Sequence, residues 1–135
     1  MSGGPIDWRE LFAASAGRTA RAPAWIAIAV LLGVSALYET AAVSTVKFLT
    51  FWFVDPLLLA SGACVIAKRL HDRGRSGWWA ALVLFAFVLV WPSPHGARAV
   101  IALPVLIWAV VELGLLPGEP GVNRFGPSPL ATAPI

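Results

Sequence analysis

The sequence is poor in charge, in acidic residues and in cysteine. Charged residues make up 13% of the 135 positions, about half the share typical of soluble domains, and only seven residues are acidic. The single cysteine, Cys64, excludes an intramolecular disulfide and any metal site built from several cysteines. Hydrophobic residues make up 59% of the chain, more than a soluble domain of this length can bury. The excess apolar surface therefore predicts an integral membrane protein in which that surface faces lipid.

The apolar residues fall into four runs, which predict four transmembrane helices in an all-α, polytopic membrane protein of one domain. The predicted spans are residues 23–46, 48–70, 77–91 and 97–116. The third span is the shortest and needs flanking residues or a locally thinner bilayer to cross. Within the second span, Pro56 either kinks a long helix or begins a shorter one with Asp55 as its cap. We expect a start or a sharp kink at this point.

The two ends of the chain differ from these runs. Aromatic and apolar residues recur at helical spacing after a cap-like Asp7, so residues 6–16 predict a short amphipathic helix in the membrane interface. Residues 117–135 are rich in glycine and proline and predict an irregular cytoplasmic tail.

Basic residues are distributed unevenly between the two sides of a four-span topology. Lys47 and Arg98 fall on one side, and the other eight fall on the opposite side. The eight are Arg9, Arg18, Arg21, Lys68, Arg69, Arg73, Arg75 and Arg124. Because cytoplasmic loops carry an excess of Lys and Arg, both termini and the central loop are predicted to be cytoplasmic. A cleavable leader ending near Ala36 and a three-span topology with Arg124 on the other side are less favoured alternatives.

The formal charge of +3 indicates an anionic partner. Because the arginines lie in short loops beside apolar runs, anionic lipid headgroups are expected as partners, and nucleic acid is not. A second copy of the chain or another membrane protein is left open as a further partner. The sequence predicts no cofactor, no metal site and no catalytic residue.

The central loop, residues 68–79, holds the densest group of polar residues. Gly74 suits a left-handed helix end and Ser76 suits the N-cap of the next helix, whose amide groups and positive dipole end would face a phosphate. The candidate site for an anionic lipid or a phosphorylated ligand consists of Arg18, Arg21, Arg69, Arg73, Arg75, Ser76 and Arg124. The alternative is that these arginines only set the topology and extend to lipid headgroups.

His71 and Asp72 carry the groups used in acid–base chemistry, so a membrane enzyme acting at headgroup level is one alternative function. Adjacent residues of a helix point about 100° apart, however, which disfavours a joint catalytic role. We expect Asp72 to pair with Arg69, Arg73 or an arginine from another segment. His71 is expected to bond the backbone at a helix end.

Glu112 lies about one turn from the end of the last apolar run. Acids within a membrane are usually paired or functional. We expect it to pair with a local arginine such as Arg18, Arg21 or Arg69. A small transporter or channel component that uses this acid is the second alternative function. The residues assigned to a structural polar motif are His71, Asp72, Gly74, Gly77, Trp78, Glu112 and Asn123.

Three segments carry specific motifs. They read Gly17-Arg18-x-x-Arg21 followed by Trp25, then Arg69-Leu70-His71-Asp72-x-Gly74-x-Ser76-Gly77-Trp78-Trp79, then Gly118-x-x-Gly121-x-Asn123-Arg124-Phe125-Gly126-Pro127. Together and in this order they resemble the bacterial inner-membrane family called domain of unknown function 805. The resemblance spans residues 17–129 and implies a small polytopic helical protein of the bacterial inner membrane, without an established activity. Ala24, the pair Ala22 and Pro23, and Ser128 depart from the family pattern, where an aromatic, a charged pair and an acid are usual.

Overall fold

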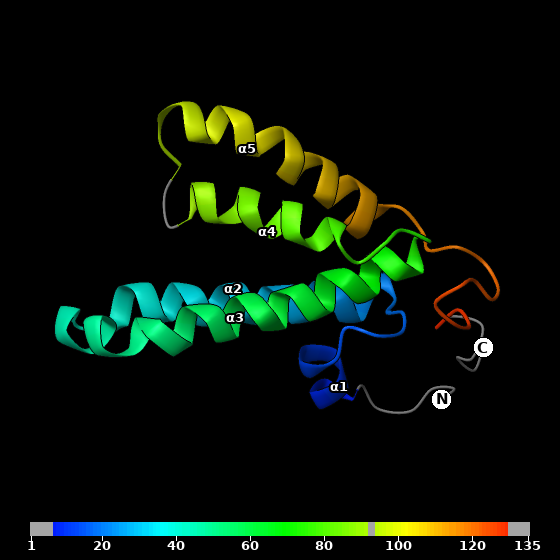
Figure 1. Ribbon diagram of the computed structural model, residues 1–135, viewed down its shortest axis with the longest axis horizontal. Coiled ribbons are helices and arrows are strands. Elements are labelled where there is room, and N and C mark those ends of the chain that lie inside the picture. The colour runs from blue at the N-terminus through cyan, green and yellow to red at the C-terminus, as the bar shows by residue number, and fades with distance from the viewer. Residues whose placement is uncertain (1–6, 92–93, 130–135) are drawn as a thin grey trace.

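The structure, a computed structural model, describes residues 7–91 and 94–129 (Figure 1). Within these ranges every regular element is a helix, apart from an isolated bridge between Asn123 and Gly126. The elements are α1 (Trp8–Ala13), α2 (Arg21–Ala41), α3 (Ser44–Asp72), α4 (Trp79–Val90), α5 (Gly96–Ala109) and the π-helix η1 (Val110–Leu115), which continues α5. The predicted all-helical fold is confirmed for these residues. Residue 6 and residues 130–135 of the predicted segments lie outside the described residues.

Three of the described helices are long and apolar enough to cross a membrane, namely α2, α3 and the continuous helix of α5 and η1. The other apolar helix, α4, has 12 residues. At 1.5 Å per residue it is about 18 Å long, which is shorter than the roughly 30 Å of a bilayer's hydrocarbon core. The number of membrane crossings therefore depends on α4.

The turn between α2 and α3 lies earlier in the chain than predicted. The sequence predicts a break at residue 47, whereas α2 ends at Ala41 and α3 begins at Ser44. Lys47 belongs to the first turn of α3, and its Nζ lies 3.2 Å from Glu39 Oε2 in the last turn of α2. A cation beside the negative end of α2 stabilises this tight turn. At the N-terminal side, α1 covers only six residues of the predicted helix, because the chain becomes extended at Ala14.

α3 is continuous through Pro56, so the expected start of a helix at this residue is wrong. Proline inside a helix costs about 3 kcal/mol, because it removes one backbone hydrogen bond and crowds the preceding turn. Ending the helix here would leave several backbone groups unpaired among apolar side chains, which costs more. Asp55 is accordingly an exposed residue within the helix and not a cap.

α2 and α3 form one helical hairpin, and α4 and α5 form a second (Figure 1). The hairpins meet where α3 ends, α4 begins and η1 packs against α2, and they separate toward their turns. Residues 117–129, called the tail below, lie at the end where the hairpins meet, and α1 packs against α3. We call this end of the bundle the polar end.

The bundle carries charge inside and apolar residues outside. Arg69 is the largest fully buried side chain among the described residues. By contrast, Phe48, Trp52 and Val100 are 70%, 70% and 72% exposed. Water-soluble monomers rarely expose so much contiguous apolar surface, so the outer face of this bundle suits lipid.

Candidate functional site

Asp72, the last residue of α3, binds two buried arginines. Its Oδ1 accepts a hydrogen bond from Arg18 Nε at 3.0 Å, and its Oδ2 accepts one from Arg69 Nη1. The side chains of Asp72, Arg18 and Arg69, called the Asp72 cluster below, are 4%, 1% and 2% exposed. Buried charges are tolerated only when they are paired and their remaining donors are bonded. The stability of the cluster therefore depends on the partners of the other guanidinium N–H groups.

Arg18 lies between α1 and α2 and joins the end of α3 to the tail. Its Nη1 donates to the carbonyl of Gly121 at 2.7 Å and to that of Gly126 at 3.0 Å, and its Nη2 donates to the carbonyl of Glu119 at 2.6 Å. The tail is also bonded directly to α3, because the amide of Glu119 donates to the carbonyl of Asp72 at 2.7 Å. A single guanidinium thus bonds three backbone carbonyls of the tail and holds the tail against the end of α3.

Arg69 bonds to the last turn of η1. Its Nε donates to the carbonyl of Leu113 and its Nη2 to the carbonyl of Leu116, both at 2.6 Å. The final carbonyls of a helix have no partner within the helix, and a charged donor is a strong substitute. Arg69 therefore supplies donors to two backbone carbonyls at the end of η1, Leu113 and the C-cap Leu116.

α2 supplies partners for the carbonyls of Gly114 and Leu115, which lie between the two that Arg69 binds. Trp25 Nε1 donates to the carbonyl of Gly114 at 2.9 Å, and Arg21 Nη1 donates to that of Leu115 at 2.7 Å. A Cβ atom at Gly114 would lie 2.5 Å from the Trp25 ring, so this approach requires glycine. The four carbonyls of residues 113–116 thus all bond to side chains of α2 or α3. Neither the π-helix nor the role of Trp25 was predicted, because the sequence of η1 reads as the continuation of an apolar α-helix.

Glu112 in η1 pairs with two arginines of the central loop. Its Oε1 accepts from Arg73 Nη2 at 3.0 Å and from Arg75 Nε at 2.7 Å. Arg73 Nη1 also donates to the carbonyl of Pro117 at 2.6 Å, at the start of the tail. The sequence predicts a different set of partners for this acid, namely Arg18, Arg21 or Arg69. The predicted pairing with a local arginine is confirmed, but the three arginines named are not the partners, because they are occupied by Asp72 or by backbone carbonyls.

His71 binds the backbone at a helix end and stacks on the tail. Its Nδ1 lies 2.8 Å from the carbonyl oxygen of Gly17, which places the proton on Nδ1, since a carbonyl only accepts. The imidazole ring stacks on Phe125 with 3.9 Å between centroids and 9° between planes. Asn123 Nδ2 donates to the carbonyl of His71 and to Glu119 Oε2, both at 2.9 Å. These contacts commit His71 to holding the N-terminal segment and the tail together.

Glycines allow the central loop and the tail to approach closely. Gly74 has φ +73°, the left-handed conformation that its position predicts, and a Cβ there would lie 2.1 Å from Glu119 Oε1. A Cβ at Gly118 would lie 1.9 Å from Asp72 Oδ2, and one at Gly77 would lie 2.9 Å from His71 Nε2. Both glycines of the central loop therefore have steric reasons to be glycine.

Ser76 does not cap α4, so that prediction is wrong. The N-cap position is held by Trp78, without a side-chain cap bond, and Ser76 Oγ only accepts from the amide of Trp78 at 3.4 Å. The carbonyls of Ser76 and Gly77 instead accept from Trp79 and Ala80 at 3.3 and 2.9 Å. These backbone bonds form the first turn, so a hydroxyl cap is not needed. The Trp78 side chain points away from the polar motif and is 86% exposed.

Arg21 and Arg124 differ from the other four candidate arginines because they have no carboxylate partner among residues 7–91 and 94–129. Arg21 bonds to the carbonyl of Leu115, and Arg124 Nη2 lies 3.5 Å from the carbonyl of Gly74 with its guanidinium 4.7 Å from the centroid of the Phe125 ring. Both residues are exposed.

The polar end carries the whole net charge of the protein. Eight of the ten basic residues lie there with five of the seven acidic ones, Asp7, Glu10, Asp72, Glu112 and Glu119. In the other half of the bundle, Lys47 and Arg98 balance Glu39 and Asp55. Within residues 7–91 and 94–129, no three His, Cys, Asp or Glu side chains lie close enough to hold a metal ion.

Replacing Arg18 by lysine is expected to lower the free energy of unfolding by about 3 kcal/mol, although the charge is kept. A single ammonium cannot reach Asp72 and the three tail carbonyls together, so buried acceptors lose their donors. Unfolding in mixed detergent micelles would measure the effect. The control is Arg98→Lys at an exposed position, with an expected change within about 0.5 kcal/mol. Equal stabilities of the two variants would contradict the assigned role of the guanidinium.

A sequence model of the family described as "Protein of unknown function (DUF805)" matches residues 12–127. The chain belongs to this family. Among DUF805-related proteins of Escherichia coli (strain K12), the uncharacterized protein YiiR is 36% identical over 121 residues, which cover 82% of each chain. The inner membrane protein YhaH is 35% identical over 63 residues, which cover 46% of this chain and 37% of YhaH. No solved structure matches the chain.

The three DUF805 motifs recognised in the sequence meet at the polar end. The first supplies Arg18, the second supplies Arg69, His71 and Asp72, and the third supplies the tail carbonyls that Arg18 binds. Segments separated by about fifty residues in the chain thus form one bonded unit. In this DUF805 protein, the motif residues with the most partners are buried and connect protein segments to one another.

Proposed function

We propose that this protein crosses the bacterial inner membrane four times and binds anionic lipid headgroups at its polar end, which faces the cytoplasm. Three helices long enough to cross and a fourth apolar helix support an integral membrane protein. The family relative YhaH is named an inner membrane protein, which supports the choice of membrane. The observation that carries the lipid proposal is the position of the net charge, all of which lies at one end of an otherwise apolar bundle.

The fourth crossing is assigned to α4. This helix packs antiparallel to α5 in a hairpin (Figure 1), so both helices run between the same two ends of the bundle. Tryptophans at both ends of α4, Trp78 and Trp79 at the start and Trp91 just after the end, suit the two membrane interfaces. A locally thinner bilayer accommodates a helix of this length.

The orientation follows from the charge asymmetry. Cytoplasmic loops of inner-membrane proteins carry the excess of Lys and Arg, so the polar end is assigned to the cytoplasm. α1 is assigned to the interface on the same side. Lys68 Nζ holds it to α3 through the Glu10 carbonyl at 2.5 Å and Glu10 Oε1 at 3.4 Å, and Trp8 remains exposed toward the headgroup layer.

The burial of the Asp72 cluster reduces the number of arginines that can bind lipid. Arg18 and Arg69 are almost fully enclosed, and Arg73 and Arg75 share the carboxylate of Glu112. Arg21 and Arg124 are exposed and bond to backbone carbonyls, and no carboxylate among the described residues compensates their charge. We therefore assign headgroup binding mainly to Arg21 and Arg124.

The variants Arg21→Gln and Arg124→Gln test this assignment. Each is expected to weaken the binding of phosphatidylglycerol by about 1 kcal/mol, or roughly fivefold, because each removes one charge near the headgroups. The measurement is the amount of phosphatidylglycerol retained over phosphatidylcholine in native mass spectrometry of the purified full chain. Arg98→Gln, which removes one exposed charge from the other half of the bundle, is the matched control and should leave retention unchanged. Equal retention by all three variants would reject headgroup binding at the polar end.

A further inference from the structure

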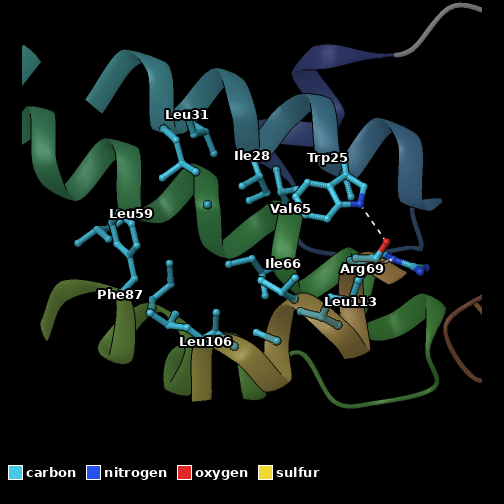
Figure 2. Close-up of a pocket in the computed structure, with 18 of the residues that line it drawn as sticks. Trp25, Ile28, Leu31, Leu59, Val65, Ile66, Arg69, Phe87, Leu106 and Leu113 are labelled. Atoms are coloured by element: carbon cyan, nitrogen blue, oxygen red, sulfur yellow. Dashed lines mark hydrogen bonds between the residues drawn. The ribbon is translucent and has the colours of Figure 1, made fainter. Parts of the chain in front are cut away.

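An apolar groove runs between the two helical hairpins (Figure 2). Its volume is about 340 Å³, within the range of ligand pockets. α2 and α3 form one wall, with Ile28, Leu31 and Ile66 among the lining residues, and α4 and α5 form the other, with Phe87 and Leu106. The groove is large enough for a ligand and lies within the apolar part of the bundle.

The polar groups along the groove are already bonded within the protein. The Ser35 hydroxyl donates to the carbonyl of Leu31 at 2.8 Å, and the Trp25 ring nitrogen donates to Gly114. Arg69 uses its guanidinium for Asp72 and η1, so its aliphatic stem is what the groove can contact. The walls thus offer an occupant apolar contacts, which favours an apolar ligand.

The two ends of the groove differ. Toward the polar end it is closed by the contact between Trp25 and Gly114, seen as the dashed line in Figure 2. Arg21 lies one turn before Trp25, at the start of α2, and bonds to Leu115, the residue after Gly114. An exposed guanidinium therefore lies just outside the closed end of the groove. In the opposite direction the hairpins separate (Figure 1). An occupant can therefore be apolar along its length and anionic at one end.

We propose that the groove holds one acyl chain of an anionic phospholipid, with the phosphate at Arg21. The proposal rests on the proposed headgroup binding and adds a site for the chain. A lipid molecule has the required distribution of charge, and acyl chains surround a membrane-spanning bundle. A helix of a second copy is about 10–12 Å across with its side chains and would have to force the hairpins further apart, whereas an acyl chain is a single file of methylene groups.

Two glycines provide a matched pair of variants. A Cβ at Gly62, on the groove wall, would lie 3.6 Å from Leu84 Cδ2 and 3.9 Å from Leu31 Cδ1, so the first carbon of a larger side chain fits. The rest of a leucine at this position would occupy the groove. Gly33 lies on an exposed face of α2, where a Cβ would meet nothing within 4 Å. Gly62→Leu therefore fills the groove, while Gly33→Leu adds the same group outside it.

The experiment compares retention of long-chain (dipalmitoyl) and short-chain (dihexanoyl) phosphatidylglycerol by the purified full chain in native mass spectrometry. In the parent and in Gly33→Leu, the long-chain lipid is expected to be retained better than the short-chain lipid. In Gly62→Leu, retention of the long-chain lipid is expected to fall by about tenfold, which corresponds to the contacts of about two buried methylene groups. Retention of the short-chain lipid should be the same in all three, because the headgroup site is intact.

Two results would overturn the acyl-chain site. One is equal retention of the long-chain lipid by Gly62→Leu and Gly33→Leu. The other is a loss of dimer from the Gly62→Leu spectrum alone, which would assign the groove to a second copy of the chain. A parent that retains both chain lengths equally would also reject the site, whether or not the variant folds. Failure of headgroup binding gives a different result, because phosphatidylcholine would then be retained as well as phosphatidylglycerol at either chain length.

Discussion

The variant Asp72→Asn is expected to lower the free energy of unfolding by roughly 3–5 kcal/mol, the cost of leaving buried charges without their counter-ion. Asp72 is the carboxylate that compensates both Arg18 and Arg69, and all three side chains are at most 4% exposed. Asparagine has nearly the same shape, so packing is kept while the negative charge is lost. The amide nitrogen would also face a guanidinium, donor against donor.

The control for this variant is Asp55→Asn, which removes an exposed carboxylate from the same helix. Its expected effect is within about 0.5 kcal/mol, as for most surface substitutions. Unfolding in mixed micelles would compare the two variants with the parent. Similar destabilisation by both would mean that the loss of charge on α3, and not the burial of the Asp72 cluster, determines stability.

The variant Gly118→Ala is expected to release the tail from the end of α3. The added Cβ would lie 1.9 Å from Asp72 Oδ2 and 2.4 Å from Asp72 Cγ. Asp72 cannot move aside, because Arg18 and Arg69 hold both of its oxygens. The expected cost is about 3 kcal/mol, at the upper end of the range for overpacking. This cost makes the free energy of tail docking less favourable and not that of helix packing, since the tail can detach while the helices remain packed.

Trypsin cleavage after Arg124 measures this release, because Phe125 is stacked on His71 in the docked tail. Faster cleavage is expected in Gly118→Ala, with helix content unchanged by circular dichroism. Gly33→Ala serves as the control, since a Cβ there meets nothing, and alanine is expected to stabilise α2 by up to about 1 kcal/mol. Parent-like cleavage of Gly118→Ala would contradict the close approach of the tail to Asp72.

The sequence predicts much of the architecture, because local patterns determine it. The apolar runs fix the helices, and the pairing of Asp72 with Arg69 follows from their spacing of three residues near a helix end. The family motifs identify the three segments that meet. The glycines at positions 74 and 118 are conspicuous in these motifs. The sequence does not reveal which side chains of other residues pack against them.

The features that the sequence did not predict depend on how the helices are rotated in the assembled bundle. Which arginines pair with Glu112 depends on how η1 packs against the central loop, and η1 is a π-helix, whose wider turn changes the direction in which each residue points. The path of α3 through Pro56 depends on the energetic cost of unpaired backbone in an apolar environment, which local propensity does not include. The groove is formed by the two hairpins together, and neither hairpin alone contains it.

The dependence of the Asp72 cluster on the tail has a consequence for biosynthesis. The ribosome makes residues 117–129 after all of the helices, so a growing chain contains Arg18, Arg69 and Asp72 well before the carbonyls of Glu119, Gly121 and Gly126 exist. Until then the Arg18 guanidinium must stay hydrated, because it lacks the partners that permit its burial. Closure of the polar end is therefore a late event, because the burial of Arg18 waits for the tail to be made.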